Sequence, residues 1–275
     1  MVLATGVPRA DPVNASGTPT MTSTGVTALN SPSTVTSTNV ATASSTATAT
    51  SATTTTTVRP SETTSSRRPA SPPVAAITAS HPEAPWFASS VGGATRVISV
   101  VGNGGSNAVL STWQKSGEDW TAVIDSVTAK VGSPGISTSY GESSAATPAG
   151  VFAITSAFGR QPNPGTGMSY LHVDNSDWWV SDVSSPDYNT HQRCAPGTCP
   201  FNEQASENLW NAGGVYDYAL VMGVNSRRVP GAGSAFFVHV TNGAPTAGCV
   251  AIPASTLVST LRWVQPGTVI ALSAR

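Results

Sequence analysis

Short runs of apolar, β-branched residues recur along residues 96–272, each bounded by Gly, Pro, Asn or Ser. This pattern predicts many short strands separated by tight turns. We expect strands at residues 96–101, 108–113, 120–124, 126–131, 150–155, 178–180, 218–221, 235–240, 249–252 and 268–272.

One stretch, residues 253–264, has the spacing of an amphipathic helix: Pro253 opens it, and Leu257, Leu261 and Val264 fall on one face. A weaker helical pattern covers residues 203–210. Many strands and few helices predict a mainly β fold, a sandwich or barrel-like core with a peripheral helix. The Gly/Pro-rich middle, residues 156–215, is too long for an idle connection, so we expect it to cover a site.

Residues 1–85 differ sharply in composition: they hold no aromatic residue, while 34 positions are Ser or Thr and 10 are Pro. Such a segment cannot bury enough apolar surface to offset the entropy of ordering, so we expect a disordered stalk. Stretches of this type are common in exported proteins and often carry O-linked sugars, although an unmodified tail or a mis-assigned start is the alternative. Residues 86–275 hold every aromatic residue and form the predicted folded domain.

Charge narrows the function classes. The chain has 13 Lys and Arg, 14 Asp and Glu, and a net charge of −1, which leaves no basic field for nucleic-acid phosphates. No run of 18 apolar residues could span a bilayer. Residues 1–14 lack the apolar core of a secretory signal, so either the chain is not exported by the standard route or its leader lies upstream of this start.

Two of the three cysteines, Cys194 and Cys199, flank a Pro-Gly turn. This spacing suits a small disulfide hairpin in an oxidising compartment, which would also support export. The alternative is a metal site that uses His191 with both cysteines, but no fourth ligand with convincing spacing accompanies them.

The third cysteine, Cys249, follows Gly248, and His239 lies ten residues upstream in an apolar run. Two adjacent strands joined by this connection could bring the imidazole to the thiol, which needs a base to become a nucleophile. The N–H groups of Gly248 and Cys249 could then stabilise a developing oxyanion. On spacing alone, a buried structural cysteine and a core histidine remain the alternative.

The stretch FFVHVTNGAPTAGCVAIP, which contains both residues, resembles the catalytic region of the L,D-transpeptidases, bacterial cell-wall enzymes, and most of all an actinobacterial-type subgroup. A second block, residues 147–152 (TPAGVF), resembles the family's TPxGxF segment. Residues 178–180 (WWV) and 188–189 (YN) are also similar to that subgroup, and the likeness covers roughly residues 95–275.

The resemblance implies a mainly β catalytic domain in which Cys249 is the nucleophile and His239 its base. The substrate would be a peptidoglycan stem tetrapeptide: a thioester forms, D-alanine leaves, and the side-chain amine of another stem closes a 3→3 cross-link. Water as the acceptor would give carboxypeptidase activity. The resemblance implies no metal or other cofactor, a place in the cell wall outside the cell, and, we expect, a monomer.

Two positions depart from the family pattern: Ala247 stands where a His is common, and Ala251 stands where an Arg or Asn is usual. The gap between His239 and Cys249 is also shorter than in the best-known members. We expect Tyr170 and Thr246 to contact the substrate. The rival interpretations are a catalytically inert wall-binding protein on the same fold and a sortase-like cysteine transpeptidase.

The cysteine assignment makes a prediction. Titration of the unfolded, unreduced protein should find one free thiol per chain, that of Cys249, because the other two are paired. A count of three free thiols would contradict the disulfide.

Overall fold

The computed structural model of this protein describes residues 84–275. Apart from its last two residues, the Ser/Thr/Pro-rich segment expected at residues 1–85 lies outside the described residues.

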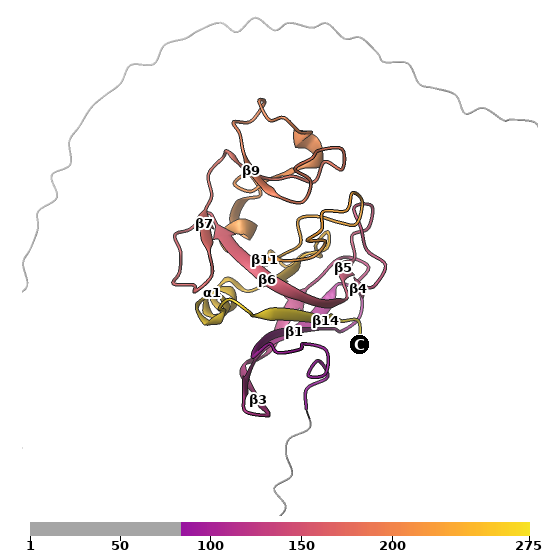
Figure 1. Ribbon diagram of the computed structural model, residues 1–275, viewed down its shortest axis with the longest axis vertical. Helices are drawn as coiled ribbons and strands as arrows, with labels where there is room; N and C mark the ends of the chain where they lie inside the picture. Colours follow the sequence, from indigo (N-terminus) through magenta and orange to yellow (C-terminus); the bar gives the residue numbers. More distant parts are fainter. Residues whose placement is uncertain (1–83) are drawn as a thin grey trace, which may run out of the picture. The chain divides into compact units, whose positions relative to one another are not determined.

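The described residues form a closed, mainly β fold around one large sheet (Figure 1). The strand order is β11-β12-β13-β3-β2-β1-β14-β6-β7, and β11 also pairs with β6, which closes the sheet into a barrel. The strands are β1 (Arg96–Gly102), β2 (Asn107–Ser116), β3 (Asp119–Lys130), β6 (Gly150–Gly159), β7 (Tyr170–His172), β11 (Ala219–Met222), β12 (Phe237–Val240), β13 (Val250–Ile252) and β14 (Val269–Ser273). The predicted fold class is therefore confirmed.

Most of the predicted strands are present within a few residues of their expected bounds, and one pair of them is merged. Residues 120–124 and 126–131 belong to a single strand, β3, which pairs along its length with β2. Ser126 adopts a left-handed φ of 56°, and the β2–β3 register shifts beyond Leu110. Such an irregularity lets a strand continue through polar residues that resemble a turn in the sequence.

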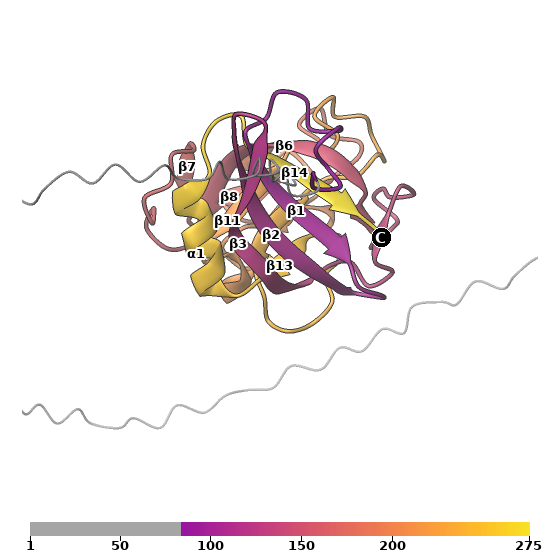
Figure 2. The same ribbon diagram turned by 90° about the horizontal axis from the view of Figure 1, so that it is seen from below.

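The predicted helix at residues 253–264 is confirmed as α1 (Ala254–Trp263), and Leu257 and Leu261 on its apolar face are fully buried. Figure 2 shows α1 beside the barrel strands. The weaker helix predicted at residues 203–210 is wrong. Only a single 3₁₀ turn, η1 (Glu203–Ala205), forms there, and β10 (Glu207–Asn208) follows and pairs with β8 (Asp177–Trp179). Cross-strand pairing has overridden a weak local preference.

The barrel interior is filled by apolar side chains from its strands and from α1, among them Ile98, Val100, Leu110, Leu220, Val238, Val250, Ile252, Leu257, Leu261 and Ile270. A second buried cluster, which includes Phe158, Tyr216, Phe237 and Cys249, lies on the other side of β11, β12 and β6. The aromatic rings of this cluster meet edge to face: Phe237 packs at 5.0–5.6 Å from Phe158, Trp179 and Tyr216.

A small lobe, which we call the cap (residues 174–209), is built on the three-stranded sheet β10-β8-β9, where β9 is His191–Arg193. It is the lobe at the top of Figure 1. The predicted disulfide between Cys194 and Cys199 is present, with 5.3 Å between the Cα atoms. Because the two sulfurs are bonded to each other, they cannot serve as ligands in the alternative metal site with His191.

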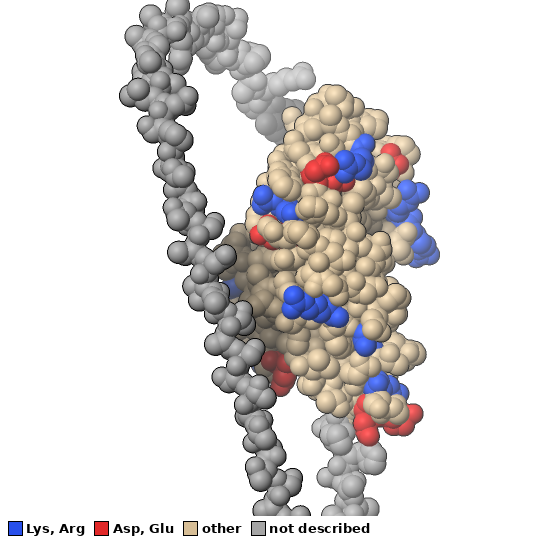
Figure 3. All heavy atoms as spheres, turned by 90° about the vertical axis from the view of Figure 1, so that its left-hand side faces the viewer, with Lys and Arg blue, Asp and Glu red and all other residues tan. Residues whose placement is uncertain are grey.

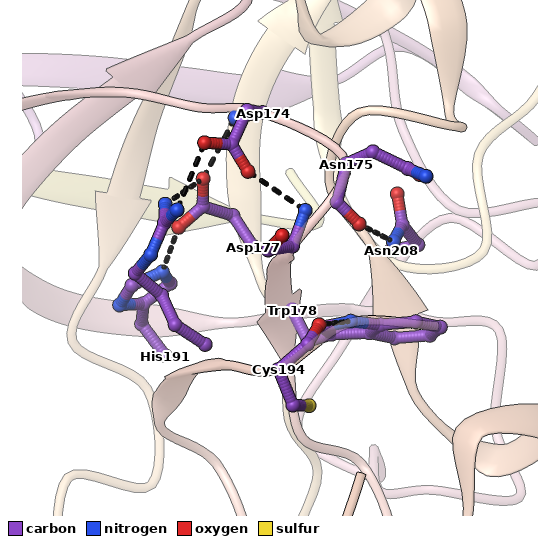
Figure 4. Close-up of polar contacts among 9 residues, drawn as sticks. Asp174, Asn175, Asp177, Trp178, His191, Cys194 and Asn208 are labelled. Carbon is purple, nitrogen blue, oxygen red and sulfur yellow. Dashed lines mark hydrogen bonds and ion pairs between the residues drawn. The ribbon is translucent and has the colours of Figure 1, made fainter. Parts of the chain in front are cut away.

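A buried carboxylate organises the cap (Figure 4). Asp177 has no exposed surface; its two oxygens lie 2.8 Å from His191 Nε2 and 2.7 Å from Arg193 Nη1. Its Oδ2 also accepts a hydrogen bond from the Asp174 N–H at 2.7 Å. Because removal from water disfavours an unpaired charge, these partners are what allow the carboxylate to lie inside the lobe.

Two further short strands, β4 (Ile136–Ser137) and β5 (Thr147–Pro148), pair in parallel, and a 3₁₀ turn, η2 (Gly213–Tyr216), precedes β11. Charged side chains are sparse and scattered on the face drawn in Figure 3. Within residues 84–275, no helix has the length and apolar character that a membrane span requires.

Candidate active site

Parallel pairing of β12 with β13 decides where His239 and Cys249 lie. His239 is opposite Ala251, and Val238 is opposite Val250. Since side chains alternate along a strand, Val238 and Val250 point into the barrel core, whereas His239 and Cys249 point to the opposite face. His239 and Cys249 therefore lie on the same side of the sheet, and a catalytic pairing of the two remains a prediction.

The turn before β13 requires a glycine. Gly248 has a φ of +135°, and a Cβ atom there would lie 2.8 Å from the Phe236 ring and 3.3 Å from the Ala146 carbonyl oxygen. Both the left-handed backbone and the lack of space exclude larger residues. Gly248 thus allows the backbone just before Cys249 to pass close to the Phe236 ring.

Two threonines hold the backbone of Cys249. Its carbonyl oxygen accepts a hydrogen bond from Thr246 Oγ1 at 2.6 Å and another from Thr147 Oγ1 at 3.2 Å. Thr147 belongs to the TPxGxF-like segment, 102 positions earlier in the chain, so the two sequence blocks that resemble the family meet at this cysteine. Thr246 Oγ1 also accepts the Gly248 N–H at 3.2 Å, so this hydroxyl is used within the turn.

The thiol of Cys249 is bonded to the backbone of the neighbouring strand. Sγ donates to the Ala235 carbonyl oxygen at 3.3 Å and accepts the Phe237 N–H at 3.4 Å. Burial raises the pKa of the thiol well above its ordinary value, and the charge of Glu207 adds to this effect, while the Phe237 N–H opposes it. The thiol is therefore protonated at neutral pH in this state.

The carbonyl that accepts the thiol is itself held in an uncommon geometry. Ala235 has a left-handed φ of 54°, which costs a non-glycine residue energy. The Asn189 side chain accepts the Trp179 indole N–H at 2.9 Å and the Ala235 N–H at 3.4 Å. The WWV and YN segments noted in the sequence thus support the strand that contacts the sulfur.

The ring of His239 is oriented by the backbone. Its Nδ1 lies 2.9 Å from the Val240 carbonyl oxygen, which can only accept, so Nδ1 carries the proton and Nε2 of the neutral ring has a free lone pair. Burial lowers the pKa of His239, while this hydrogen bond opposes the effect. Tyr216 packs edge-on against the imidazole at 5.5 Å. A neutral histidine with a basic Nε2 can act as a general base.

Among the described residues, no hydrogen bond joins the thiol to the imidazole. In the present state the thiol proton is directed to Ala235 and not to His239. Transfer of that proton to Nε2 therefore requires the thiol to leave its hydrogen bond to the Ala235 carbonyl oxygen.

A cavity of about 280 Å³ opens beside Cys249. Its walls come from four parts of the fold: a barrel loop, the cap, the segment before β12 and the turn before Cys249. The lining residues there are Gly141, Glu142 and Ser144; Ser181 and residues 204–207; residues 234–236; and Ala247. Part of the long middle segment thus lines this cavity, and its role at a functional site remains a prediction.

The remaining predicted site residues lie differently. Tyr170 on β7 does not line this cavity; its hydroxyl donates to the Gln161 carbonyl oxygen at 2.8 Å. The Gly248 N–H is bonded to Thr246, so of the two predicted oxyanion donors only the Cys249 N–H is not engaged there.

Three residues at the site were not found from the sequence: Glu142, Glu207 and Tyr216. Glu142 and Glu207 line the cavity, and the Tyr216 hydroxyl donates to Glu207 Oε2 at 2.6 Å. No motif marked them, because they lie on separate segments that meet only in the fold.

The described residues thus combine a closed β barrel, Cys249 in the wall of a cavity just before β13, and His239 on the paired strand β12. Residues 112–272 match the YkuD family model, described as the L,D-transpeptidase catalytic domain. This match spans more than half of the chain, and the chain therefore belongs to the L,D-transpeptidase (YkuD) family, which acts in peptidoglycan metabolism. No curated protein and no solved structure gives a significant match.

The raised pKa of Cys249 makes a prediction. Because only the thiolate reacts, alkylation by iodoacetamide should be slow at pH 7 and still accelerate above pH 9, beyond the ordinary cysteine pKa of about 8.5. The unreduced protein unfolded in urea, in which Cys249 is the single free thiol, should react faster at neutral pH and reach its plateau earlier. A plateau below pH 8 in the folded protein would instead indicate a preformed thiolate–imidazolium pair.

Proposed function

We propose that this protein is an L,D-transpeptidase that uses Cys249 as its nucleophile and His239 as its base. The observation that supports the proposal is the shared face of the paired segments: His239 on β12 and Cys249 just before β13 lie on the same side of the sheet, Cys249 lines a cavity, and Thr147 of the second family segment bonds the cysteine backbone. The substrate is the peptidoglycan stem tetrapeptide, cleaved between its diamino acid and the terminal D-alanine.

The proton moves twice in this mechanism. After rotation of its side chain, the Cys249 thiol gives its proton to His239 Nε2, and the thiolate attacks the carbonyl carbon. The oxyanion that forms accepts a hydrogen bond from the Cys249 N–H. Collapse of the tetrahedral intermediate breaks the C–N bond, and the imidazolium returns its proton to the leaving D-alanine amine. A thioester remains on Sγ.

A second stem peptide then resolves the thioester. Its side-chain amine attacks the thioester carbonyl, loses its proton to His239, and forms the amide of a 3→3 cross-link while the Cys249 thiol is regenerated. Water in place of the amine gives an L,D-carboxypeptidase. No step draws on a metal or a redox group, since the acyl bond energy is conserved in the thioester.

We also propose that the domain acts outside the cell as a monomer. The Cys194–Cys199 disulfide supports an oxidising compartment, because such bonds are rare where thiols are kept reduced. The family's substrate, peptidoglycan, is in the same compartment.

One observation favours the rival function of an inert wall-binding protein. The Cys249 thiol is protonated and bonded to Ala235, and the positions next to it in the family pattern are alanines, Ala247 and Ala251. Ala251 lies opposite His239 on the neighbouring strand and offers it no polar group. An inert protein would keep this arrangement with no acylation of the sulfur, so reactivity separates the two functions.

The proposed nucleophile can be tested with a carbapenem, which mimics the donor's acyl group. We expect intact-mass spectrometry to show one covalent adduct on the wild type and none on Cys249→Ala. An unmodified wild type after prolonged incubation would favour the inert binder.

The proposed base makes a separate prediction. We expect His239→Ala to slow acylation by roughly 10²- to 10⁴-fold, the usual range for a lost general base. The matched control is His172→Ala, since His172 is exposed and bonds only to the Arg160 carbonyl oxygen. Stopped-flow acylation measured on both variants decides this, and an unchanged rate in His239→Ala would remove the residue from the mechanism.

A further inference from the structure

The charged side chains that line the cavity beside Cys249 are all acidic. Its described lining contains two carboxyl groups, Glu142 and Glu207, and no Lys, Arg or His. The other polar side chains that line it are neutral: Ser144, Ser181, Gln204, Ser206 and Ser234. A cavity of this composition attracts a cation and repels a carboxylate.

Each of the two carboxyl groups is held in place by a buried tyrosine. Tyr216, 5% exposed, donates its hydroxyl to Glu207 Oε2 at 2.6 Å. Tyr188, 2% exposed, donates its hydroxyl to Glu142 Oε1. In both pairs one carboxyl oxygen accepts the tyrosine hydroxyl, and no hydrogen bond among the described residues engages the other. Side chains fixed by buried partners in this way form a preorganised binding site.

The two carboxyl groups come from different parts of the fold and act on each other. Glu142 belongs to a barrel loop and Glu207 to β10 of the cap. Burial raises the pKa of Glu207, and the charge of Glu142 raises it further, while the Tyr216 hydrogen bond opposes both. Two carboxylates that share a cavity without a cation are unfavourable, and a bound cation would relieve their repulsion.

The third feature of the cavity is the sulfur of the candidate nucleophile in the same wall. The charge of Glu207 is one of the causes that oppose formation of the Cys249 thiolate. A cation bound between the carboxylates would compensate that charge and so ease deprotonation of the thiol. Cation binding and thiol activation would therefore reinforce each other.

We propose that Glu142 and Glu207 bind the side-chain ammonium group of the stem peptide's diamino acid next to Cys249. An ammonium group has three donors, enough for one free oxygen of each carboxylate and a cavity serine such as Ser206. This inference rests on the proposed function, which supplies the stem peptide. It adds the residues that recognise the amine and make the enzyme select a charged diamino acid over its neutral form.

The recognition step can be tested without catalysis. Full-chain Cys249→Ala is titrated in a calorimeter with a stem tripeptide whose side-chain amine is free and with the same tripeptide acetylated on that amine. We expect the free amine to bind at least about tenfold more tightly, because charge-assisted hydrogen bonds are among the stronger ones. Equal dissociation constants for the two peptides would overturn the proposal.

Variants then assign the preference to the two carboxyl groups. In the Cys249→Ala background, Glu207→Gln and Glu142→Gln keep the tyrosine hydrogen bonds but remove the charge, and each should reduce the preference for the free amine. The control is Glu118→Gln, because Glu118 is exposed on the β2–β3 hairpin and pairs only with Lys115. A preference that survives the double variant would overturn the proposal, as would its loss in the control.

The ammonium could come from the donor or from the acceptor stem, and catalysis distinguishes the two. With Cys249 intact, acylation that slows when the donor's amine is acetylated assigns the site to the donor. If acetylation of the donor's amine leaves wild-type acylation unchanged, while Glu207→Gln lowers the ratio of cross-link to hydrolysis, the site is assigned to the acceptor. If neither of these two effects is observed, the proposal is contradicted.

Failure of the proposed function has a separate signature. If no acyl-enzyme forms although Cys249→Ala distinguishes the two tripeptides, the ammonium site is supported and the proposed enzyme reaction is contradicted. If acylation proceeds and the two tripeptides bind Cys249→Ala equally, the proposed reaction is supported and the ammonium site is contradicted.

Discussion

The parallel pairing of β12 with β13 is the constraint on which the rest of the site depends. It sorts the residues of both strands into two sets, so that Val238, Val250 and Ile252 fill the barrel while His239 and Cys249 face the cap. A slip of one residue would exchange the two faces and place the imidazole and the thiol in the core. The apolar core therefore fixes the register, and the register fixes the chemistry.

Where the sequence predicted the structure well, the signal was local. Alternating apolar residues gave the barrel strands, and the 3.6-residue spacing gave α1, because these patterns report directly on a buried face. The predicted helix at residues 203–210 failed because β10 is held by a partner strand, β8, that lies some 30 positions earlier. The family motifs marked Cys249 and His239 as the candidate reacting groups, and the Pro-Gly turn predicted the disulfide, so neither prediction needed coordinates.

The rest of the site could not be predicted, since it depends on contacts across long stretches of chain. Thr147 was visible as part of a motif, but its hydrogen bond to the Cys249 carbonyl appears only when the two segments meet. Glu142 and Glu207 belong to no motif. Each accepts a hydrogen bond from a buried tyrosine on another segment, Glu142 from Tyr188 and Glu207 from Tyr216. Tyr170 shows the converse, an aromatic residue whose hydroxyl is used by the nearby backbone instead of the cavity.

The same geometry explains how a protonated thiol is compatible with catalysis. In the present state the sulfur is bonded to Ala235 and Phe237, and burial together with Glu207 keeps its proton in place. The neutral His239 ring, with its Nδ1 proton bonded to Val240, can accept a proton only at Nε2. Because only a thiolate is a strong nucleophile, we expect such a thiol to react slowly with electrophiles. In the mechanism proposed above, a positively charged substrate group would change that balance, because it would compensate the carboxylate charge when the acyl group arrives. Reactivity would then depend on the substrate itself, so that under the proposed function a thioester would form only with a stem peptide in the cavity.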